Sequence, residues 1–213
     1  MIGNWKWKLA QSLEIKWWKN YLDNKDIQTY LKWKQQYWKD FITKIPNIPT
    51  LENLTILDAG CGPAGIFTAL KNNKVYALDP LLDEYKKLAH FDPVWYPYTQ
   101  FITQSIEQIE TKEEYDVIFC LNAINHVENI ELAYKKLAEA LKPNGWLIVS
   151  IDAHRNAFLH KLFKILPGDV LHPHQYNLKE YEGFMAQNKI NLLPSILIKK
   201  EFIFDYYVTY GKK

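Results

Sequence analysis

The chain has 213 residues, with 48% hydrophobic content and a formal net charge of +2. This size and composition predict one globular domain with an appendage and exclude a disordered chain. The sequence contains no run of about 18 apolar residues and no apolar leader at its start, so we expect a cytoplasmic protein without a membrane span or signal peptide.

The positive charge is concentrated at the N-terminus. Residues 1–50 hold nine lysines against four acidic residues, a net +5, so the other 163 residues carry −3. Only one of the 26 basic residues is an arginine, Arg155. Since arginine is the side chain best suited to clamping phosphates and reading guanine, nucleic acid is not expected as the main partner.

The first 45 residues predict two helices, at 5–22 and 27–45, before a break that contains Pro46 and Pro49. Apolar residues recur along the second helix at steps of three and four, and Lys34 interrupts this stripe. The two helices hold six of the eight tryptophans. Three roles stay open for them: packing against a sheet, a lid that presents aromatic walls to a substrate, and peripheral contact with an anionic membrane through Trp and Lys.

After residue 49 the chain alternates short apolar runs with helical stretches. This alternation predicts βαβ units and a parallel sheet. The expected strands lie at 54–59, 75–78, 99–103, 116–121 and 146–151, and the expected helices lie at 66–72, 82–88, near 106 and at 130–141.

The last part of the chain departs from this alternation. Residues 152–177 are irregular and hold four of the six histidines. A helix at 178–188 follows, with Asn177 and Glu180 placed as a capping box. The final runs, 192–199 and 202–210, are expected to pair as antiparallel strands, because a parallel return needs about a dozen linking residues.

The segment TILDAGCGPAGIF at residues 55–67 can be read in two ways. From Gly60 it spells G-x-G-x-x-G, the turn that brings a nucleotide close to the backbone. From Asp58 it spells D-x-G-x-G, which adds a carboxylate before the first glycine. A dinucleotide would place its pyrophosphate near Asp58, and two like charges about 4 Å apart cost on the order of 4 kcal/mol. A cationic, phosphate-free nucleoside such as S-adenosylmethionine would instead be attracted by this carboxylate.

A second acidic residue also favours a nucleoside ligand. Asp79 ends the second expected strand, 21 residues after Asp58, where its carboxylate is placed to accept from both hydroxyls of a ribose. Asp before Pro is also an ordinary turn former, so Asp79 alone leaves both roles open. The spacing of the two acids favours the ribose.

Five segments together resemble the class I S-adenosylmethionine-dependent methyltransferases: LDAGCGPAG, VYALDP, YDVIFCLNAINHV, LKPNGWLIVS and the closing strand pair. The resemblance implies an α/β, Rossmann-like three-layer sandwich with a seven-stranded, mostly parallel sheet and an antiparallel C-terminal strand. We expect an N-terminal helical extension at 1–48 and a methyltransferase domain at 49–213, with a substrate-side insertion at about 152–177.

The same resemblance implies which residues bind the cofactor. One group surrounds the methionine part and the methyl, and the other surrounds the adenosine. The first group is Asp58, Gly60, Cys61, Gly62 and Asn122, and the second is Asp79, Pro80, Leu81, Ser105 and Ile106. The family often carries an acid at the third strand end, where this chain has Gln104 and Ser105.

The catalytic candidates are Asn122, His126 and His174. Methyl transfer from a sulfonium mainly requires that the nucleophile is held in line with the methyl and that water is excluded, so a general base is optional. His126 follows the fourth expected strand and is the first candidate for a base, with helix capping or packing as its alternative role. His174 lies in the insertion and is expected to face the substrate cavity.

Further cavity candidates are His154, His172 and Tyr176, from the same insertion. His172 and His174 are two residues apart, but no third ligand is evident nearby, so no metal site is expected. The cysteines, Cys61 and Cys120, have no C-x-x-C spacing and are expected as reduced thiols.

The sequence therefore predicts a cytoplasmic methyltransferase that acts on a small, apolar or aromatic molecule. One alternative is a nicotinamide-dependent oxidoreductase on a Rossmann domain, which shares the glycines but is disfavoured by Asp58 and by the closing strands. The other is a non-catalytic S-adenosylmethionine-binding protein on the same fold.

Overall fold

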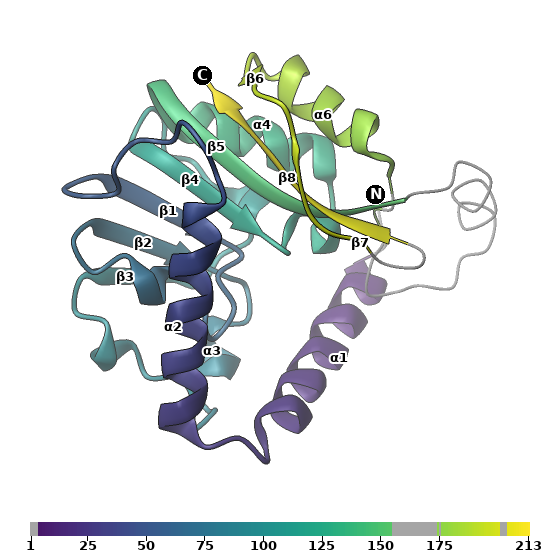
Figure 1. Ribbon diagram of the computed structural model, residues 1–213. Coiled ribbons are helices and arrows are strands. Elements are labelled where there is room, and N and C mark those ends of the chain that lie inside the picture. Colours follow the sequence, from purple (N-terminus) through teal and green to yellow (C-terminus); the bar gives the residue numbers. More distant parts are fainter. Residues whose placement is uncertain (1–3, 155–173, 175, 201–203) are drawn as a thin grey trace.

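The computed structural model describes residues 4–154, 174, 176–200 and 204–213 (Figure 1). Most of the predicted insertion at 152–177, including His160 and His172, lies outside these residues. The described part contains one mixed sheet with helices on both of its faces.

The sheet has the strand order β3-β2-β1-β4-β5-β8-β6, and β7 also pairs with β8. β1 to β5 run parallel, whereas β8 is antiparallel to β5, β6 and β7. The predicted mostly parallel sheet with an antiparallel C-terminal strand is thereby confirmed. The strands are β1 Thr55–Ala59, β2 Lys74–Leu78, β3 Thr99–Ile102, β4 Tyr115–Leu121, β5 Leu141–His154, β6 Asn191–Leu192, β7 Ile196–Lys200 and β8 Phe204–Lys212.

The α-helices are α1 Asn4–Leu22, α2 Ile27–Thr43, α3 Leu82–Tyr85, α4 Ile130–Ala140 and α6 Leu178–Gln187. Single 3₁₀ turns are η1 Ile66–Ala69, η2 Pro93–Trp95, η3 Ile106–Gln108 and η4 Ile124–His126. The predicted capping box of α6 is present, since Asn177 accepts from the amide of Glu180 and Glu180 accepts from the amide of Asn177.

Side chains along each strand point alternately to the two faces of the sheet, so the core has two halves, one on each face. On β1, Leu57 packs in the half that contains α4 and α6, and Ile56 packs in the half that contains Trp38 and Phe41 of α2. Figure 1 shows α4 and α6 together on one face and α2 across the other. This is the expected three-layer sandwich.

The region after β1 differs from the prediction. Residues 66–72 were expected to form a helix, but they form only the turn η1, because α2 occupies the space beside it. The indole of Trp38 donates to the carbonyl of Ala64 over 2.9 Å, and the amide of Gln35 donates to the carbonyl of Thr68 over 3.0 Å. A helix that precedes the sheet in the chain therefore covers the glycine loop.

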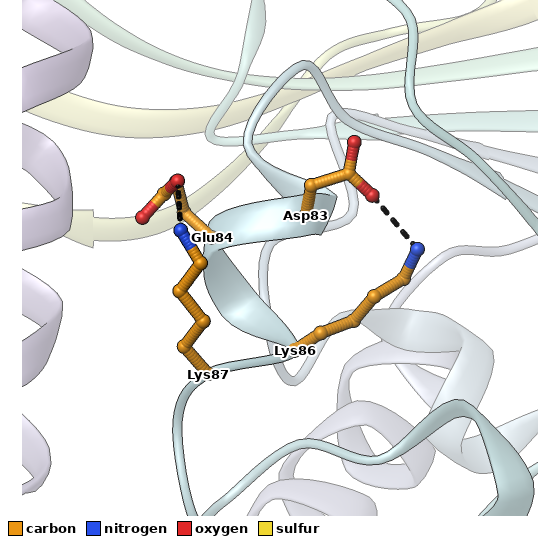
Figure 2. A network of polar contacts seen from close by, with 4 residues as sticks. All are labelled: Asp83, Glu84, Lys86 and Lys87. Carbon is orange, nitrogen blue, oxygen red and sulfur yellow. Dashed lines mark hydrogen bonds and ion pairs between the residues drawn. The ribbon is translucent and has the colours of Figure 1, made fainter.

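Two other predicted elements are shorter than expected. The helix at 82–88 is the single turn α3, whose outward side carries the exposed ion pairs Lys86–Asp83 and Lys87–Glu84 (Figure 2). Such exposed pairs contribute little to stability. The strand at 192–199 is interrupted near Pro194 and forms β6 and β7.

The two N-terminal helices differ in how firmly they pack. α2 buries Tyr30, Trp38 and Phe41, whereas α1 leaves Leu9 and Leu13 about 40% exposed. Among the described helices, none combines the length and the apolar character that crossing a membrane requires.

Candidate functional site

A cavity of about 560 Å³ lies where β1, β2 and β4 end, and α1 and α2 form its other wall. In open α/β sheets, ligands bind in the crevice outside the carboxyl ends of the strands. All the cofactor-binding residues that the sequence predicts, except Leu81, line this cavity: Asp58, Gly60, Cys61, Gly62, Asp79, Pro80, Ser105, Ile106 and Asn122.

Asp58 faces the cavity and also holds the glycine turn. It is 1% exposed, and its Oδ2 accepts from the amide of Phe67 at the start of η1 over 3.0 Å. Burial raises the pKa of this carboxyl to about 7, although the Phe67 amide and the ammonium of Lys34 act in the opposite direction. The sequence predicted an attraction for a cationic ligand, and the structure adds a role in loop geometry that the prediction did not contain.

Gly60 and Gly62 have left-handed backbone conformations, with φ of 75° and 55°. A Cβ on Gly60 would lie 2.2 Å from the Cβ of Ala123, so the ends of β1 and β4 touch only because this residue is glycine. A Cβ on Gly62 would meet Trp18 of α1 at 3.6 Å. The glycine loop therefore packs against β4 on one side and α1 on the other.

Asp79 follows β2 and is 6% exposed. Its Oδ1 accepts from the amide of Leu81 over 2.8 Å, and its Oδ2 accepts from the amide of Gly62 over 3.0 Å. Burial and the negative charge of Glu14 raise the pKa of Asp79 to about 7. Each carboxylate oxygen keeps a further lone pair, so ribose hydroxyls are able to donate here without breaking the loop contacts. Leu81 itself is buried beside the loop and does not line the cavity.

The third strand end brings an acid that the sequence analysis did not identify. Glu107 lines the cavity just after Ser105 and Ile106, and its Oε1 accepts from the amides of Glu128 and Asn129 over 2.7 and 3.1 Å. The acid that the family often carries at the position of Gln104 and Ser105 is absent there, and Glu107 lies two residues after Ser105, within η3.

Asn122 is held at the end of β4 by a residue of β5. Its φ is 55°, its amide donates to the hydroxyl of Ser150 over 2.8 Å, and that hydroxyl donates back to its Oδ1 over 3.1 Å. Ser150 is fully buried. Because Oδ1 is engaged, the Nδ2 group of Asn122 is the side-chain donor left for a ligand in the cavity.

The two histidines proposed as catalytic differ in whether they line the cavity. His126 lines the cavity from η4, whereas His174 does not. The Nε2 of His174 lies 2.9 Å from the carbonyl oxygen of Val127, its ring stacks on Tyr176, and burial lowers its pKa. The expectation that His174, His154 and Tyr176 face this cavity is therefore not met, since none of the three is among its lining residues.

Sequence reasoning also missed the contribution of individual residues of α1 and α2. Besides aromatic residues, these helices place one acid and one base in the cavity, Glu14 and Lys34. Glu14 accepts from the hydroxyl of Tyr85 over 3.1 Å. The interruption of the apolar stripe by Lys34 was the available signal. The full set is Gln11, Glu14, Trp17, Trp18, Tyr21, Tyr30, Lys34 and Trp38.

Cys61 and Cys120 are free thiols. Cys61 lines the cavity, and both Cys61 and Cys120 are buried and unbridged. Burial raises the pKa of both thiols. In the part of the chain that the structure describes, no group of three or more His, Cys, Asp or Glu is placed to hold a metal ion.

Comparison with known proteins assigns the chain to a family. The model of the methyltransferase domain family matches residues 30–191. The chain belongs to this methyltransferase family. The match confirms the predicted membership of the S-adenosylmethionine-dependent methyltransferases, and with it the predicted enzyme class and cofactor, so the nicotinamide oxidoreductase alternative is set aside.

One curated relative is the ubiquinone biosynthesis O-methyltransferase of Rickettsia felis, which is 30% identical over 143 residues. That match covers 66% of this chain and 58% of the relative, so the chain spans little more than half of that protein.

Two solved structures share the fold of this methyltransferase. Magnesium protoporphyrin IX methyltransferase from Synechocystis PCC 6803, which contains S-adenosylhomocysteine, has a TM-score of 0.65 at 20% identity and 95% coverage of both chains. N-methyltransferase NodS from Bradyrhizobium japonicum, also in complex with S-adenosylhomocysteine, has a TM-score of 0.61 at 12% identity and 90% coverage of both chains.

The cavity of this methyltransferase fits a cationic nucleoside. Among the described residues its lining has four acids, Glu14, Asp58, Asp79 and Glu107, and one lysine, Lys34. The amide of Gly62 is already bound by Asp79, so a phosphate at the glycine turn would have to compete with a carboxylate for this amide. Hydroxyl donors and positive charge suit this lining, whereas a pyrophosphate does not.

Proposed function

We propose that this protein transfers a methyl group from S-adenosylmethionine to a small-molecule acceptor within the cavity. The observation that supports this most strongly is the convergence of Asp58 and Asp79, two buried acids, with the glycine turn on a cavity that helices α1 and α2 close with aromatic side chains. The cofactor supplies an activated methyl on a sulfonium, so the protein's task is binding, alignment and the exclusion of water.

Each strand end has its own role in this proposal. Asp79 accepts hydrogen bonds from the ribose hydroxyls, and the bend at Gly60 and Gly62 allows the amino-acid part to lie against the backbone. Ser150 fixes Asn122 so that its Nδ2 group orients the acceptor beside the methyl. His126 lines the same cavity and receives the acceptor's proton where one must be lost.

The walls of the cavity support an apolar or aromatic acceptor. Trp17, Trp18 and Tyr21 reach it from α1, and Tyr30 and Trp38 reach it from α2. Planar side chains of this kind stack on rings and exclude water. The relatives named O-methyltransferases add support for an acceptor oxygen.

In the same proposal α1 acts as a lid and α2 as a fixed part of the wall. α1 has exposed apolar residues and contacts the rest of the chain through a few side chains such as Glu14 and Trp18. The second role predicted for this segment, contact with an anionic membrane, draws support from the exposed Leu9, Leu13 and Trp17.

Calorimetry followed by a transfer assay tests the function. The protein is expected to bind S-adenosylhomocysteine in the micromolar range or tighter and NAD far more weakly; preferential NAD binding would overturn the proposal. A panel of small phenols, carboxylic acids and amines is then incubated with the methyl-labelled cofactor, and label is expected in at least one product. Binding without label in any acceptor of a broad panel would favour the non-catalytic alternative.

A further inference from the structure

The proposed function does not explain how the chain around His126 is held in place. His126 is the last residue of η4 and Val127 follows it, and both residues line the cavity. Asn125, on the other side of His126, is 7% exposed and is not among the lining residues. The direction of the His126 side chain therefore depends on the contacts that its two neighbours in the chain make.

Both neighbours of His126 are bound by the same part of the structure. The Oδ1 of Asn125 accepts from the hydroxyl of Tyr181 in α6 over 2.8 Å, and this bond is buried. The carbonyl oxygen of Val127 lies 2.9 Å from the Nε2 of His174, which is the donor because a carbonyl only accepts. The Tyr181 hydroxyl also lies 3.1 Å from the carbonyl oxygen of His174. The residues before and after His126 are thus joined to each other through Tyr181 and His174.

The hydroxyl of Tyr181 is the centre of these contacts. The residue is fully buried, so the hydroxyl is shielded from water. It carries one proton and has two acceptors within reach, at Asn125 and at His174. Burial raises the pKa of Tyr181, which keeps the hydroxyl protonated and able to donate. A phenylalanine would fill the same space in the core, so packing alone does not require the hydroxyl.

The residues that follow Val127 are held by a residue of the cavity wall. Glu107 lines the cavity, and its Oε1 accepts from the amides of Glu128 and Asn129 over 2.7 and 3.1 Å. The segment 125–129 is therefore fixed both by the cavity wall and by α6. Such support from outside the cavity is what keeps a functional side chain within a narrow range of directions.

We propose that Tyr181 is a positioning residue of the transfer reaction, which holds His126 toward the cavity through Asn125 and His174. This inference rests on the proposed function, in which His126 receives the proton of the acceptor. A base must lie within hydrogen-bond reach of the proton that it takes, and a misplacement of about 1 Å costs on the order of 10²-fold in rate. Tyr181 is not among the lining residues, so it acts without touching cofactor or acceptor.

Histidine NMR on the full chain tests the positioning and needs no acceptor. The imidazole rings are labelled with ¹³C, and His126→Gln assigns the resonance of His126. Tyr181→Phe is expected to shift or broaden this resonance. It should leave the resonance of His90 unchanged, because that ring is held elsewhere, with its Nε2 2.9 Å from the carbonyl oxygen of Lys25.

The matched control is Tyr134→Phe, which removes a hydroxyl from the same half of the core. Tyr134 is fully buried, and its hydroxyl has no hydrogen-bond partner among the described residues. Its loss should leave the resonances of His126 and His90 unchanged. Asn125→Ala removes the bond to Tyr181 from the other end, so it provides the same test where Tyr181→Phe does not fold.

Kinetics and calorimetry distinguish positioning from general support of the fold. With the acceptor of the panel that is methylated fastest, Tyr181→Phe should lower kcat roughly tenfold or more, since a general base contributes about 10²–10⁴-fold. The KM for this acceptor and the affinity for S-adenosylhomocysteine should stay within about twofold. Asn125→Ala should have a similar effect, and the double variant should be no slower than the slower single variant, because both substitutions remove one bond. Thermal melts establish that each variant is folded.

The outcomes separate this inference from the proposed function. An unchanged His126 resonance in Tyr181→Phe would refute the positioning role, and so would equal losses of turnover and of S-adenosylhomocysteine affinity. Full transfer activity in His126→Gln would also overturn it, because no base would then need to be positioned. Failure of the unaltered protein to bind S-adenosylhomocysteine or to label any acceptor would instead reject the proposed function, and the NMR comparison would still decide whether Tyr181 holds His126 in place.

Discussion

Trp38 of α2 donates its indole N–H to the carbonyl oxygen of Ala64 over 2.9 Å, and both residues are buried. The bond joins a helix that precedes the sheet to the glycine loop of the site, Gly60 to Gly65. The family model begins at residue 30, inside α2, so Trp38 and most of this helix lie within the matched domain. The shape of the cofactor loop thus depends on the N-terminal part of the chain.

Replacing Trp38 with Phe is expected to destabilise the protein by about 1–3 kcal/mol, because the carbonyl of Ala64 would be left buried without a donor. Affinity for S-adenosylhomocysteine should fall as well, since the loop loses its support. Urea unfolding and calorimetry measure the two effects. Trp33→Phe is the matched control on the same helix, because Trp33 is 52% exposed, and its effect should stay within about 0.5 kcal/mol.

Three glycine-to-alanine variants should differ in a defined order. Gly60→Ala combines a φ of 75° with a Cβ 2.2 Å from Ala123, and a loss of about 2 kcal/mol or more is expected. Gly62→Ala has a φ of 55° but ordinary contact with Trp18, so a loss of about 1 kcal/mol is expected. Gly183→Ala in α6 meets nothing within 4 Å and should stabilise by about 0.5–1 kcal/mol. Chemical denaturation ranks them, and equal stabilities of the first two would contradict the contact with Ala123.

The part of the site that could be predicted lies at strand ends. Asp58, Asp79 and Asn122 each follow an apolar run, and parallel strands bring their carboxyl ends to one edge of the sheet. The local sequence pattern was therefore sufficient to predict that these three residues lie together. The capping box at Asn177 and Glu180 was predictable for the same reason, because both partners are within one helical turn.

The part that could not be predicted depends on contacts between distant segments. Residues 66–69 have apolar, helix-compatible sequence, and only the presence of α2 beside them explains why they stop after one turn. Glu107 is engaged by amides of Glu128 and Asn129, about 20 residues away, and nothing in its own neighbourhood indicated this. His174 is not among the lining residues, and its ring is held at the carbonyl of Val127, another long-range contact.

The ionisation of Asp79 predicts how nucleoside binding depends on pH. Burial and Glu14 raise the pKa of Asp79 to about 7, with Asp58 adding to the rise and the amides of Leu81 and Gly62 opposing it. Ribose hydroxyls donate to the ionised form, so binding releases a proton and affinity rises with pH through 7, then levels off. Between pH 6 and 8 the association constant for 5′-methylthioadenosine should increase roughly tenfold.

This nucleoside is preferred for the measurement because it lacks the charged amino-acid end, so the titrations of Lys34 and Asp58, whose pKa values are about 8 and about 7, do not add to the profile. Asp79→Asn tests the assignment directly: it should bind at least tenfold more weakly at pH 8 and show a flatter profile. A profile for the unaltered protein that falls between pH 6 and 8 would contradict the assignment of Asp79 as the ribose acceptor.

Two truncations distinguish the roles of the N-terminal helices. Removal of residues 1–20 takes away most of α1, whose Leu9, Leu13 and Trp17 are already exposed, so the rest of the chain should still fold and give a cooperative melt. Binding of S-adenosylhomocysteine should be measurable but weaker, because Glu14 and Trp18 no longer close the cavity. Retention of full transfer activity by this truncation would argue against a lid.

Removal of residues 1–45 is a different change, because it takes Trp38, Phe41 and Ile45 out of the core half that covers β1 and β4. Loss of a single large core side chain costs about 3–5 kcal/mol, and a domain of this kind is stable by only about 5–15 kcal/mol in total. The longer truncation should therefore fail to fold, as judged by circular dichroism and by the absence of a melting transition. A folded protein that binds S-adenosylhomocysteine normally would show that α2 is dispensable, and the account of how Trp38 supports the glycine loop would then have to be abandoned.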